Sequence, residues 1–452
     1  MDKGGEKAMS KKKIIPRNNK QYDYLSSEYI ISDKTNMLSS YAKESNNLYN
    51  LAMYHKRQHF IKHHEILSYK QMNKMFKTKY EQRENMLYHK LPYVQSAQHV
   101  LKEIDTVWYA WFKALKAYKT NPNKFTGKPR MPKYLSKGKR HSFKITNQNA
   151  TIKNGYLWIP KLKLKLKLQK NITKIQQVVL KPLMKNQFKV IVQYKTNKII
   201  SYRPDNGKYI GIDPGIDNAF TCVDSAMKHH PLIINGKVIK SINQYYNKRR
   251  SQLYSLHAQY NQNYRVIHTK QGLKKVYQES NATQKLTQWR NAKLHQFAHK
   301  ATKRIIDYAL NCGANTIVIG NNKNWKRSVN MGKKNNQNFV GIPHQKMIDM
   351  LTYKANLQGI SVITTSEGYT SQTSFLDNEK PCYQNGNAGR KAKGLVPFRR
   401  RIHRGLFRSN QNILINADVN GAYQIIRKVF PKVISDGIVG TVSCPIKYSP
   451  LI

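Results

Sequence analysis

Cysteine is scarce in this 452-residue chain, and long apolar runs are missing. Its four cysteines form no CxxC pair, so the sequence predicts neither a disulfide framework nor a four-thiolate zinc site. No apolar run approaches the roughly 18 residues that span a bilayer, and the first residues, MDKGGEKAMSKKKIIPR, lack the apolar core of a signal peptide. We therefore expect no membrane partner and a reducing, cytoplasmic compartment.

Acidic residues are also few. Asp and Glu total 23 against 80 Lys and Arg, which gives a formal net charge of +57. Self-repulsion at this charge opposes a compact state, and a polyanion relieves it. Nucleic acid is the partner we expect, because binding releases the counterions condensed on its phosphates. A basic RNA-binding protein of the ribosomal kind is the alternative for this composition. Hydrophobic residues make up 39%, enough for packed cores, and the length predicts two or three domains.

Hydrophobic spacing predicts helices in the first part of the chain. Apolar residues recur at three- and four-residue steps from about residue 35 to 77, and again over residues 95–119. Trp108 and Trp111 fall on the apolar stripe of the second segment, and we interpret both as core residues rather than base-stacking residues.

The period changes to two after a basic loop rich in Pro and Gly. Residues 136–204 alternate in a way that predicts a small antiparallel sheet or barrel, with a hairpin turn at Asn154-Gly155. Within this segment KLKLKLKLQK would bury its leucines and present a row of lysines on the other face: Lys161, Lys163, Lys165 and Lys167. We expect these lysines to contact phosphate. A solvated edge strand that its lysines protect from aggregation is the alternative.

A different pattern begins at Lys208. KYIGID and AFTCVDS are short apolar strands, and the Asn-Gly pair in PLIINGKVIK indicates another hairpin. Helices are expected over 242–261, 283–310 and 344–358, with the strands TIVIG and SVITTSE between and after them, and a last helix over 418–429. Residues between about 378 and 411 look basic and irregular. Three strands followed by helices that alternate with two more strands is the order of an RNase H-like α/β fold.

Three acidic residues stand at element ends in this region. Asp213 closes the KYIGID strand, Glu367 closes the SVITTSE strand, and Asp418 opens the last helix. Taken singly, each could be a turn or helix-end residue, but an RNase H-like sheet would bring all three to one edge. Phosphodiester hydrolysis by two hard cations about 4 Å apart needs such oxygen ligands. We predict that the three are catalytic and bind two Mg²⁺ ions, which Mn²⁺ could replace; Asp217 and Asp224 are interpreted as turn or solvated residues.

Several long motifs resemble the TnpB family. YIGIDPGIDNA, TIVIGNNKNWKR, GIPHQKMIDMLTYKANLQGISVITTSEGYTSQTSFLD and RGLFRSNQNILINADVNGAYQIIRK resemble its RuvC-type nuclease. NNLYNLAMYHKRQHF, LPYVQSAQHVLKEIDTVWYAWFKALKAY and FTGKPRMPKY resemble its N-terminal half, so the resemblance covers about residues 35–430. It implies a transposon-encoded, RNA-guided DNA endonuclease whose guide reads the target sequence, while the protein recognises a short motif beside it. Asp213, Glu367 and Asp418 match the family's catalytic triad.

The resemblance also implies an α/β multidomain organisation with an RNase H-like (RuvC) nuclease domain and an N-terminal β-barrel wedge domain with an inserted helical recognition lobe. The expected parts are a basic N-terminal arm and the start of the wedge (1–34), the recognition lobe (35–135), the wedge barrel (136–206), the first part of the nuclease (207–369), a basic target-nucleic-acid-binding insertion (370–415), the last nuclease helix (416–430) and a C-terminal tail (431–452).

Further nucleic-acid contacts follow from the same resemblance. Many relatives hold zinc in the insertion through paired CxxC motifs, but this chain has only Cys382 there, so no zinc is expected. The insertion offers arginines that we expect to touch nucleic acid, a basic loop being the alternative: Arg399, Arg400, Arg401 and Arg404. Polar residues that lie where relatives contact the duplex beside the target could read base edges, or could be helix-surface polars: Asn46, Asn47, Tyr49 and Gln98.

The expected partners are a guide RNA and double-stranded target DNA, with one protein per guide RNA and association with the nucleoid when DNA is bound. Two other functions fit parts of the sequence. A compact type V CRISPR effector would share the motifs. A non-cleaving, RNA-guided DNA-binding regulator would be expected to lose a carboxylate, and all three are retained here.

Overall fold

The structure, a computed structural model, divides the chain into two compact units, one of residues Gln21–Lys198 and one formed mainly by Ile199–Ile452. It describes residues 20–21, 24–78, 83–184, 186–196, 199–260, 264–269, 272–277, 279–321, 337, 341–368, 370–371, 373–379, 401–403, 405–433 and 440–451. None of the helices in these ranges is long and apolar enough to cross a bilayer.

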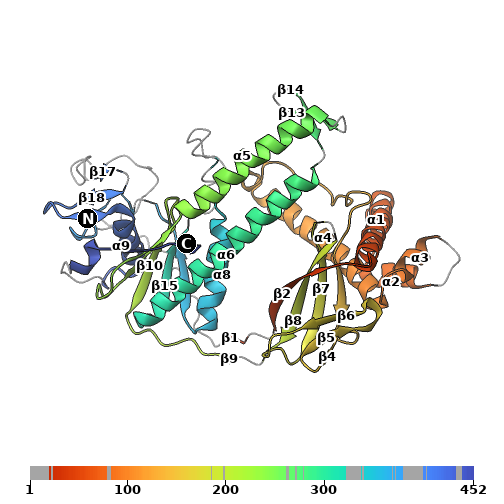
Figure 1. The fold of residues 1–452 in the computed structure, drawn as a ribbon, viewed down its shortest axis with the longest axis horizontal. Coiled ribbons are helices and arrows are strands. Elements are labelled where there is room, and N and C mark those ends of the chain that lie inside the picture. The colour runs from red at the N-terminus through yellow and green to blue at the C-terminus, as the bar shows by residue number, and fades with distance from the viewer. Residues whose placement is uncertain are drawn as a thin grey trace, which may run out of the picture. The chain divides into compact units, whose positions relative to one another are not determined.

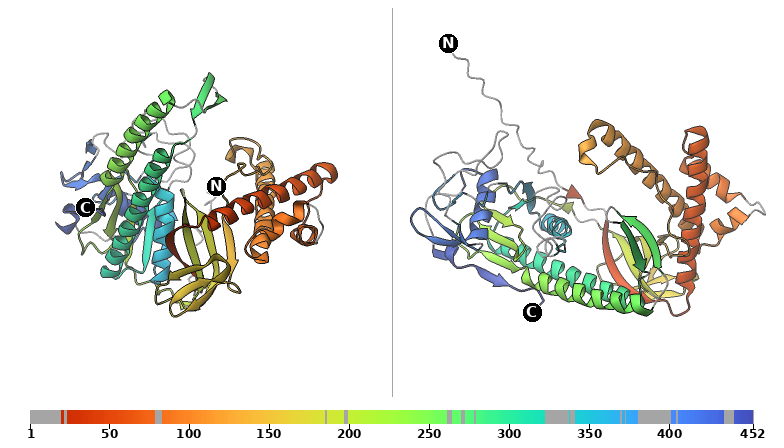
Figure 2. Two further views of the ribbon diagram at one scale, coloured as in Figure 1. Left: turned by 45° about the vertical axis from the view of Figure 1, so that its right-hand side comes forward. Right: turned by 90° about the horizontal axis from the view of Figure 1, so that it is seen from above.

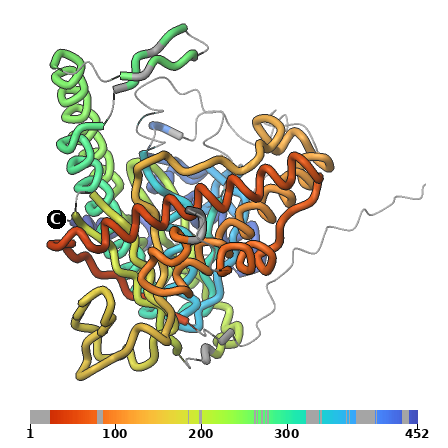
Figure 3. Tube along the Cα trace, turned by 90° about the vertical axis from the view of Figure 1, so that its right-hand side faces the viewer, coloured from red at the N-terminus to blue at the C-terminus, as the bar shows by residue number. Residues whose placement is uncertain are grey.

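The helices of the first unit share one apolar core. Figure 3 shows the course of their backbones, in red to orange. They are α1 (Met37–His63), α2 (Tyr69–Lys77), α3 (Arg83–His89) and α4 (Val94–Thr120), followed by a 3₁₀ turn at Pro122–Lys124. The indole of Trp108 is fully buried and meets the ring of Phe60 edge-on at 5.3 Å, which confirms its interpretation as a core residue. Trp111 packs on the same ring, and its indole N–H donates to the carbonyl of Pro129.

Two antiparallel sheets make up the rest of this unit and enclose a second apolar core. One sheet has the order β2 (Tyr24–Ser32), β8 (Gln187–Lys195), β7 (Ile175–Pro182), β3 (Phe143–Thr146). The other has the order β4 (Thr151–Lys153), β5 (Tyr156–Ile159), β6 (Leu164–Lys167). Strand β2 pairs with β8 along its whole length, so the four helices form an insertion between two strands of one sheet.

The turn at Asn154-Gly155 is confirmed, because both residues have positive φ and join β4 to β5. The KLKLKLKLQK segment is a strand only over β6. Lys161 lies in a 3₁₀ turn, and Lys163 has a left-handed backbone with φ of 47°. Turn and strand together still place the leucines inward and all four lysines in solvent.

The second unit is built on a six-stranded mixed sheet (Figure 1). Its order is β16 (Ser361–Thr365), β15 (Thr316–Gly320), β10 (Tyr209–Asp213), β11 (Asn218–Asp224), β12 (Leu232–Asn235), β20 (Ile446–Tyr448). Strand β11 runs antiparallel to both of its neighbours, β10 and β12. On the other side of β10, strands β15 and β16 run parallel to it.

Helices cover both faces of this sheet. On one face lie α6 (Asn281–Asn311) and α8 (His344–Leu357), which share a core with alternate residues of the strands. On the other lies α9 (Ala417–Val429), as Figure 1 shows. Helix α5 (Lys237–Tyr260) runs beside α6 (Figure 2). The smaller elements of the chain are β1 (Lys20–Gln21), β9 (Ile199–Ile200), the hairpin of β13 (Tyr264–Thr269) and β14 (Gly272–Tyr277), and a 3₁₀ turn at Gly440–Ser443.

The hairpin expected at Asn235-Gly236 is wrong, because strand β12 leads there directly into α5. Asn235 Oδ1 accepts a hydrogen bond from the backbone N–H of Lys237 at the helix start. A Cβ on Gly236 would lie 2.3 Å from the carbonyl oxygen of Ile216. The glycine therefore serves a close backbone approach and not a two-residue turn.

The expectation of an irregular segment over residues 378–411 is also wrong for its described part. Residues 401–416 contain an antiparallel sheet of β17 (Arg401–His403), β18 (Leu406–Arg408) and β19 (Leu414–Asn416). Phe407 and Ile415 are buried against α9. The prevalence of charged residues in the sequence conceals these two apolar anchors.

A buried ion pair supports the helical insertion. The Lys56 side chain is fully buried, and its ammonium donates to Asp105, whose other oxygen accepts from the N–H of Tyr69 at 2.9 Å.

We expect Asp105→Asn to lower the free energy of unfolding by about 3–5 kcal/mol, because it leaves a buried ammonium without its counter-charge. Tryptophan fluorescence during urea unfolding measures this loss, since the ammonium lies 5.8 Å from the ring centre of Trp108. The matched control, Asp307→Asn, breaks an exposed pair with Lys303 and should cost no more than about 0.5 kcal/mol; equal losses would contradict this account.

Candidate functional site

Asp213 and Glu367 lie at one edge of the six-stranded sheet, at the ends of β10 and β16, the two strands that flank β15. Asp213 is the last residue of β10, and the parallel strand β15 ends beside it at Gly320, since Ile212 pairs with Ile319. Glu367 follows β16 by two residues. A Cβ placed on Gly320 would lie 2.5 Å from Glu367 Cγ, so the Glu367 side chain lies over the end of β15, next to Asp213.

Helix α9 brings the third carboxylate to this edge. The helix packs so closely on β10 that a Cβ on Gly211 would lie 2.4 Å from the carbonyl oxygen of Ala422. A Cβ on Gly421 would lie 2.8 Å from Asp213 Oδ2. Asp418 stands one turn before Gly421, at the N-terminal end of α9. The three acidic residues therefore meet at the same edge of the sheet.

The Asp418 carboxylate is not occupied in capping its helix. Asn416 is the cap, and its Oδ1 accepts from the N–H groups of Asp418 at 3.0 Å and Val419 at 3.3 Å. Asp418 Oδ2 instead accepts a hydrogen bond of 2.7 Å from the amide of Asn218, the first residue of β11. This bond directs the carboxylate toward the strand ends and argues against a purely helix-dipole role.

Glu367 lies in a dehydrated position. Burial raises the pKa of its carboxyl to about 7, and the nearby Lys428 ammonium acts in the opposite direction. The same ammonium donates to the carbonyl oxygens of Ser366 and Gly368, both at 2.9 Å, and so holds the backbone on each side of Glu367. Since water solvates this carboxylate poorly, its charged form would gain from a bound cation.

One histidine supports the backbone of the site, and the two other acids of this region have partners or positions of their own. The imidazole of His344, at the start of α8, bonds the carbonyl of Gly215 at 2.8 Å and fixes the turn that follows Asp213. Asp217 forms a 2.6 Å ion pair with Lys240 and is about one-third exposed, as a turn residue would be. Asp224 is only 1% exposed and so is not solvated, but it does begin a turn, since its backbone carbonyl accepts from the N–H of Met227 at 3.0 Å. It closes strand β11 at the far end of the sheet, beside the C-terminal end of α6.

The donor set fits magnesium. Carboxylate oxygens are the hard ligands that Mg²⁺ prefers, and the missing side chains at Gly320 and Gly421 leave room for them. Across the described ranges, one group of three His, Cys, Asp or Glu has its ligand atoms within 4.8 Å of one another, and it contains none of these three acids.

A polar face of α9 holds the chain that follows Glu367, and the sequence analysis missed it. The amide of Asn420 accepts from the N–H of Phe375 and donates to the carbonyl of Thr373. The Arg427 guanidinium donates to the carbonyls of Phe375 and Glu379. Gln424, between them in the sequence, also donates to Glu379. The signal was present, because positions i, i+4 and i+7 form one helical face that carries polar groups in an otherwise apolar helix.

The residues expected to contact the duplex are mostly occupied within the protein. The Asn46 side chain is 1% exposed and donates to the carbonyls of Ser136 and Lys139. Tyr49 is 4% exposed and packs on the imidazole of His141. Gln98 is half-buried and hydrogen-bonds the Tyr88 hydroxyl. Asn47 alone of these four is exposed, with a 3.4 Å contact to Glu44.

The basic residues expected to contact nucleic acid fall into two groups, one exposed and one outside the described side chains. The four lysines of residues 161–167 are exposed, and Lys161 and Lys165 lie over the rings of Tyr93 and Tyr156, at 5.2 and 4.8 Å from their centres. The side chains of Arg399, Arg400, Arg401 and Arg404 lie outside the described residues.

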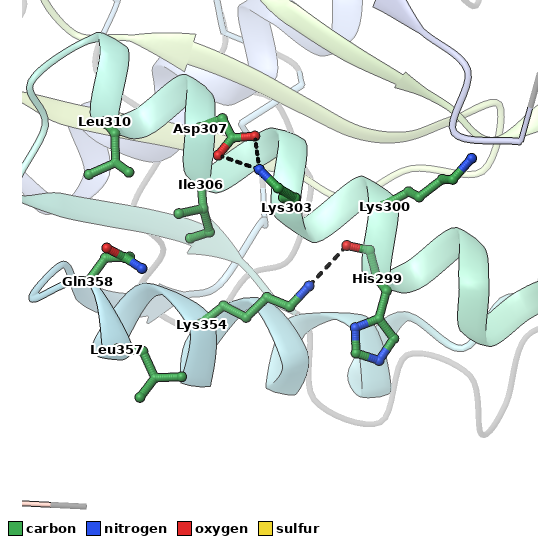
Figure 4. Close-up of a pocket in the computed structure, with 9 residues that line it drawn as sticks. All are labelled: His299, Lys300, Lys303, Ile306, Asp307, Leu310, Lys354, Leu357 and Gln358. Carbon is green, nitrogen blue, oxygen red and sulfur yellow. Dashed lines mark hydrogen bonds and ion pairs between the residues drawn. The ribbon is translucent and has the colours of Figure 1, made fainter. Parts of the chain in front are cut away.

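A hollow of about 460 Å³ between α6 and α8 offers no second reactive centre (Figure 4). Two of its lysines are engaged with neighbouring groups. Lys303 pairs with Asp307 of the same helix at 2.8 Å, and Lys354 donates to the His299 carbonyl at 2.9 Å and to the Thr302 hydroxyl at 2.8 Å. The bonds of Lys354 join α8 to α6.

Comparison with known proteins gives two family matches. Residues 187–326 match the family model described as a probable transposase, and residues 344–425 match the model described as Cas12f1-like, TNB domain. No curated protein matches the chain. Among solved structures, a Cas12f1-sgRNA-target DNA complex shares 14% identity over 89% of this chain and 98% of that one, with a TM-score of 0.33. A CRISPR-Cas12f ternary complex shares 13% over 86% and 81%, also at 0.33. These scores are too low to show a common arrangement of the whole chain.

A strongly basic α/β chain with three carboxylates at one sheet edge has the features of a protein that processes nucleic acid. The two family models cover much of the second half of the sequence, and together they support a TnpB-like family for this chain.

The close packing at Gly421 provides a test of the site. Helix propensity alone would make Gly421→Ala more stable by about 1 kcal/mol. Its methyl group, however, would displace the Asp213 carboxylate, and we expect DNA cleavage to fall about 100-fold, as for a misplacement near 1 Å. Gly405→Ala is the control, since a Cβ there meets nothing within 4 Å. If Gly421→Ala cleaves DNA at the rate of the control, the position of the Asp213 carboxylate is not needed for cleavage.

Proposed function

We propose that the protein is an RNA-guided DNA endonuclease of a transposable element, which hydrolyses DNA phosphodiesters with two divalent ions bound by Asp213, Glu367 and Asp418. One observation carries the proposal: residues separated by 154 and 51 positions (367 − 213 and 418 − 367) meet at one edge of a sheet. The family models support an RNA-guided DNA nuclease kind of function.

The proposed nuclease domain is RuvC-like. Support comes from the sheet order, in which three antiparallel strands are extended on the β10 side by two parallel ones, as expected for an RNase H-like fold. In the other unit, the insertion of four helices between β2 and β3 supports a wedge domain interrupted by a recognition lobe.

The site's own residues would position the reaction. The bound ions would supply Lewis acidity at the scissile phosphate and an activated water. Asn218 orients the Asp418 carboxylate, and Lys428 fixes the backbone around Glu367. His344 holds the turn after Asp213. Preset ligands of this kind reduce the rearrangement needed when the ions and the phosphate arrive.

The proposed partners are a guide RNA and double-stranded target DNA, with one protein per guide RNA. A net charge of +57 supports them, since a row of phosphates relieves the self-repulsion. The exposed lysines at 161, 163, 165 and 167 are proposed phosphate contacts, and the exposed Asn47 is proposed to contact the duplex. A match described as Cas12f1-like keeps a compact CRISPR effector as the second candidate, which a repeat array beside the gene would reveal.

Replacing a proposed ligand tests the function directly. We expect Asp213→Asn to abolish cleavage of guide-matched DNA in Mg²⁺ while co-purifying guide RNA is retained, because RNA binding depends on basic surfaces elsewhere. A chelator should have the same effect on the wild-type complex. Asp217→Asn is the matched control, since that residue pairs with Lys240 and should leave cleavage intact. The RNA is identified by sequencing, and cleavage is followed by gel; cutting by Asp213→Asn at the wild-type rate would disprove the assignment.

Lys428 provides a second test. Because it holds the carbonyls on both sides of Glu367 without itself being a ligand, we expect Lys428→Met to weaken Mg²⁺-dependent cleavage about 10- to 100-fold. The loss should shrink as the Mg²⁺ concentration is raised, whereas loss of a ligand would not be rescued. Lys432→Met, a change at an exposed lysine four residues later, is the control. A Mg²⁺ dependence identical to that of the wild type would exclude this positioning role.

A further inference from the structure

A second cluster of metal-ligating side chains lies at the opposite end of β11 from the proposed nuclease site. Asp224 ends β11, His229 follows in the loop toward β12, and Cys312 is the C-cap of α6. One ligand atom from each lies within 4.8 Å of the other two. Asp213 pairs with Thr221 across the strands, three residues before Asp224, so the two clusters stand about 10 Å apart along the sheet.

Two of these ligands are buried and one reaches solvent. Asp224 is 1% and Cys312 4% exposed, whereas the His229 side chain is 42% exposed. One Asp224 oxygen accepts from the N–H of Ala226 at 3.0 Å, and the other faces His229 Nδ1 at 2.8 Å. The arrangement is a buried carboxylate and a buried thiol beneath an imidazole at the surface, which leaves a path by which an ion could enter.

We propose that Asp224, His229 and Cys312 bind one divalent transition-metal ion of the zinc type, with a water as the fourth ligand. A set of one sulfur, one nitrogen and one oxygen donor suits tetrahedral Zn²⁺ and not Mg²⁺. On binding, the Cys312 S–H bond ionises, its proton leaves to solvent, and the thiolate bonds the metal; no electron is transferred. The ion would tie the end of β11 to the end of α6.

The sequence analysis predicted no zinc because it searched for closely spaced cysteine pairs, and this site has none. Such pairs lie within one short segment. Here the ligands come from a strand end, a loop and a helix end, with 83 residues (312 − 229) between His229 and Cys312. The proposal is independent of the nuclease centre, whose ligands are carboxylates alone.

Cobalt(II) is the probe that tests it, because a cobalt–thiolate bond gives a charge-transfer band that carboxylate ligands do not give. We expect full-length, metal-free protein to show this band and to saturate at one equivalent of Co²⁺. Cys312→Ser should abolish the band. Cys222→Ser is the matched control, since that buried thiol lies in the same core but outside the cluster. Cys382→Ser and Cys444→Ser should also retain the band.

A second variant protects the test against misfolding. His229 is partly exposed, so His229→Ala should fold, and we expect it to bind Co²⁺ at least about 10-fold more weakly. The absence of a thiolate band in the wild type would overturn the proposal. So would a band that survives in Cys312→Ser, or a Co²⁺ affinity that His229→Ala leaves unchanged.

Discussion

The nuclease site depends on how closely α9 approaches β10. Helices normally pack on a sheet with side chains between them, but here Gly211 and Gly421 lack those side chains where helix and strand meet. Gly320 removes a third, at the place where Glu367 lies. Three absent methyl groups thus allow carboxylates from a strand, a loop and a helix to share one small volume. Any larger residue at these points would separate them.

The same helix also arranges the chain around the site. Asp418 lies in its first turn, and its polar face hydrogen-bonds the backbone of residues 373–379. Near its end, Lys428 donates a hydrogen bond to the backbone beside Glu367. Most of its remaining side chains are buried. Catalytic placement and core packing are therefore not separable in α9, and a change made for stability would also move the acids.

Sequence reasoning located the acids because each ends or begins an apolar run, and because in mixed sheets the ends of neighbouring strands lie together. Sequence reasoning also predicted most strands and helices of the second unit, because their apolar residues recur with a regular period. Asn235-Gly236 misled it, because the pair fits a hairpin turn and a strand-to-helix junction equally well, and only the carbonyl of Ile216 decides between them. The partners of Lys428 and His344 could not be predicted, because they are backbone carbonyls, which every residue type carries.

Burial was the other quantity that sequence could not supply. Asp224 and Asn46 are polar residues for which the sequence analysis allowed solvent exposure, yet each is almost fully enclosed. Neighbours distant in sequence create that enclosure. Residues near Ser136 close over Asn46, and the C-terminal end of α6 lies beside Asp224.

The pairing of β2 with β8 has a consequence for how the chain is made. Glu28 on β2 bonds Lys189 on β8, a separation of 161 residues. Ribosomes add about 5–20 residues per second, so β2 leaves the exit tunnel on the order of 10 s or more before its partner exists. During that interval the helices of residues 37–120 can fold from local contacts, which form quickly. The strand must meanwhile remain unpaired with its edge exposed, and the first unit closes only when its last strand is synthesised.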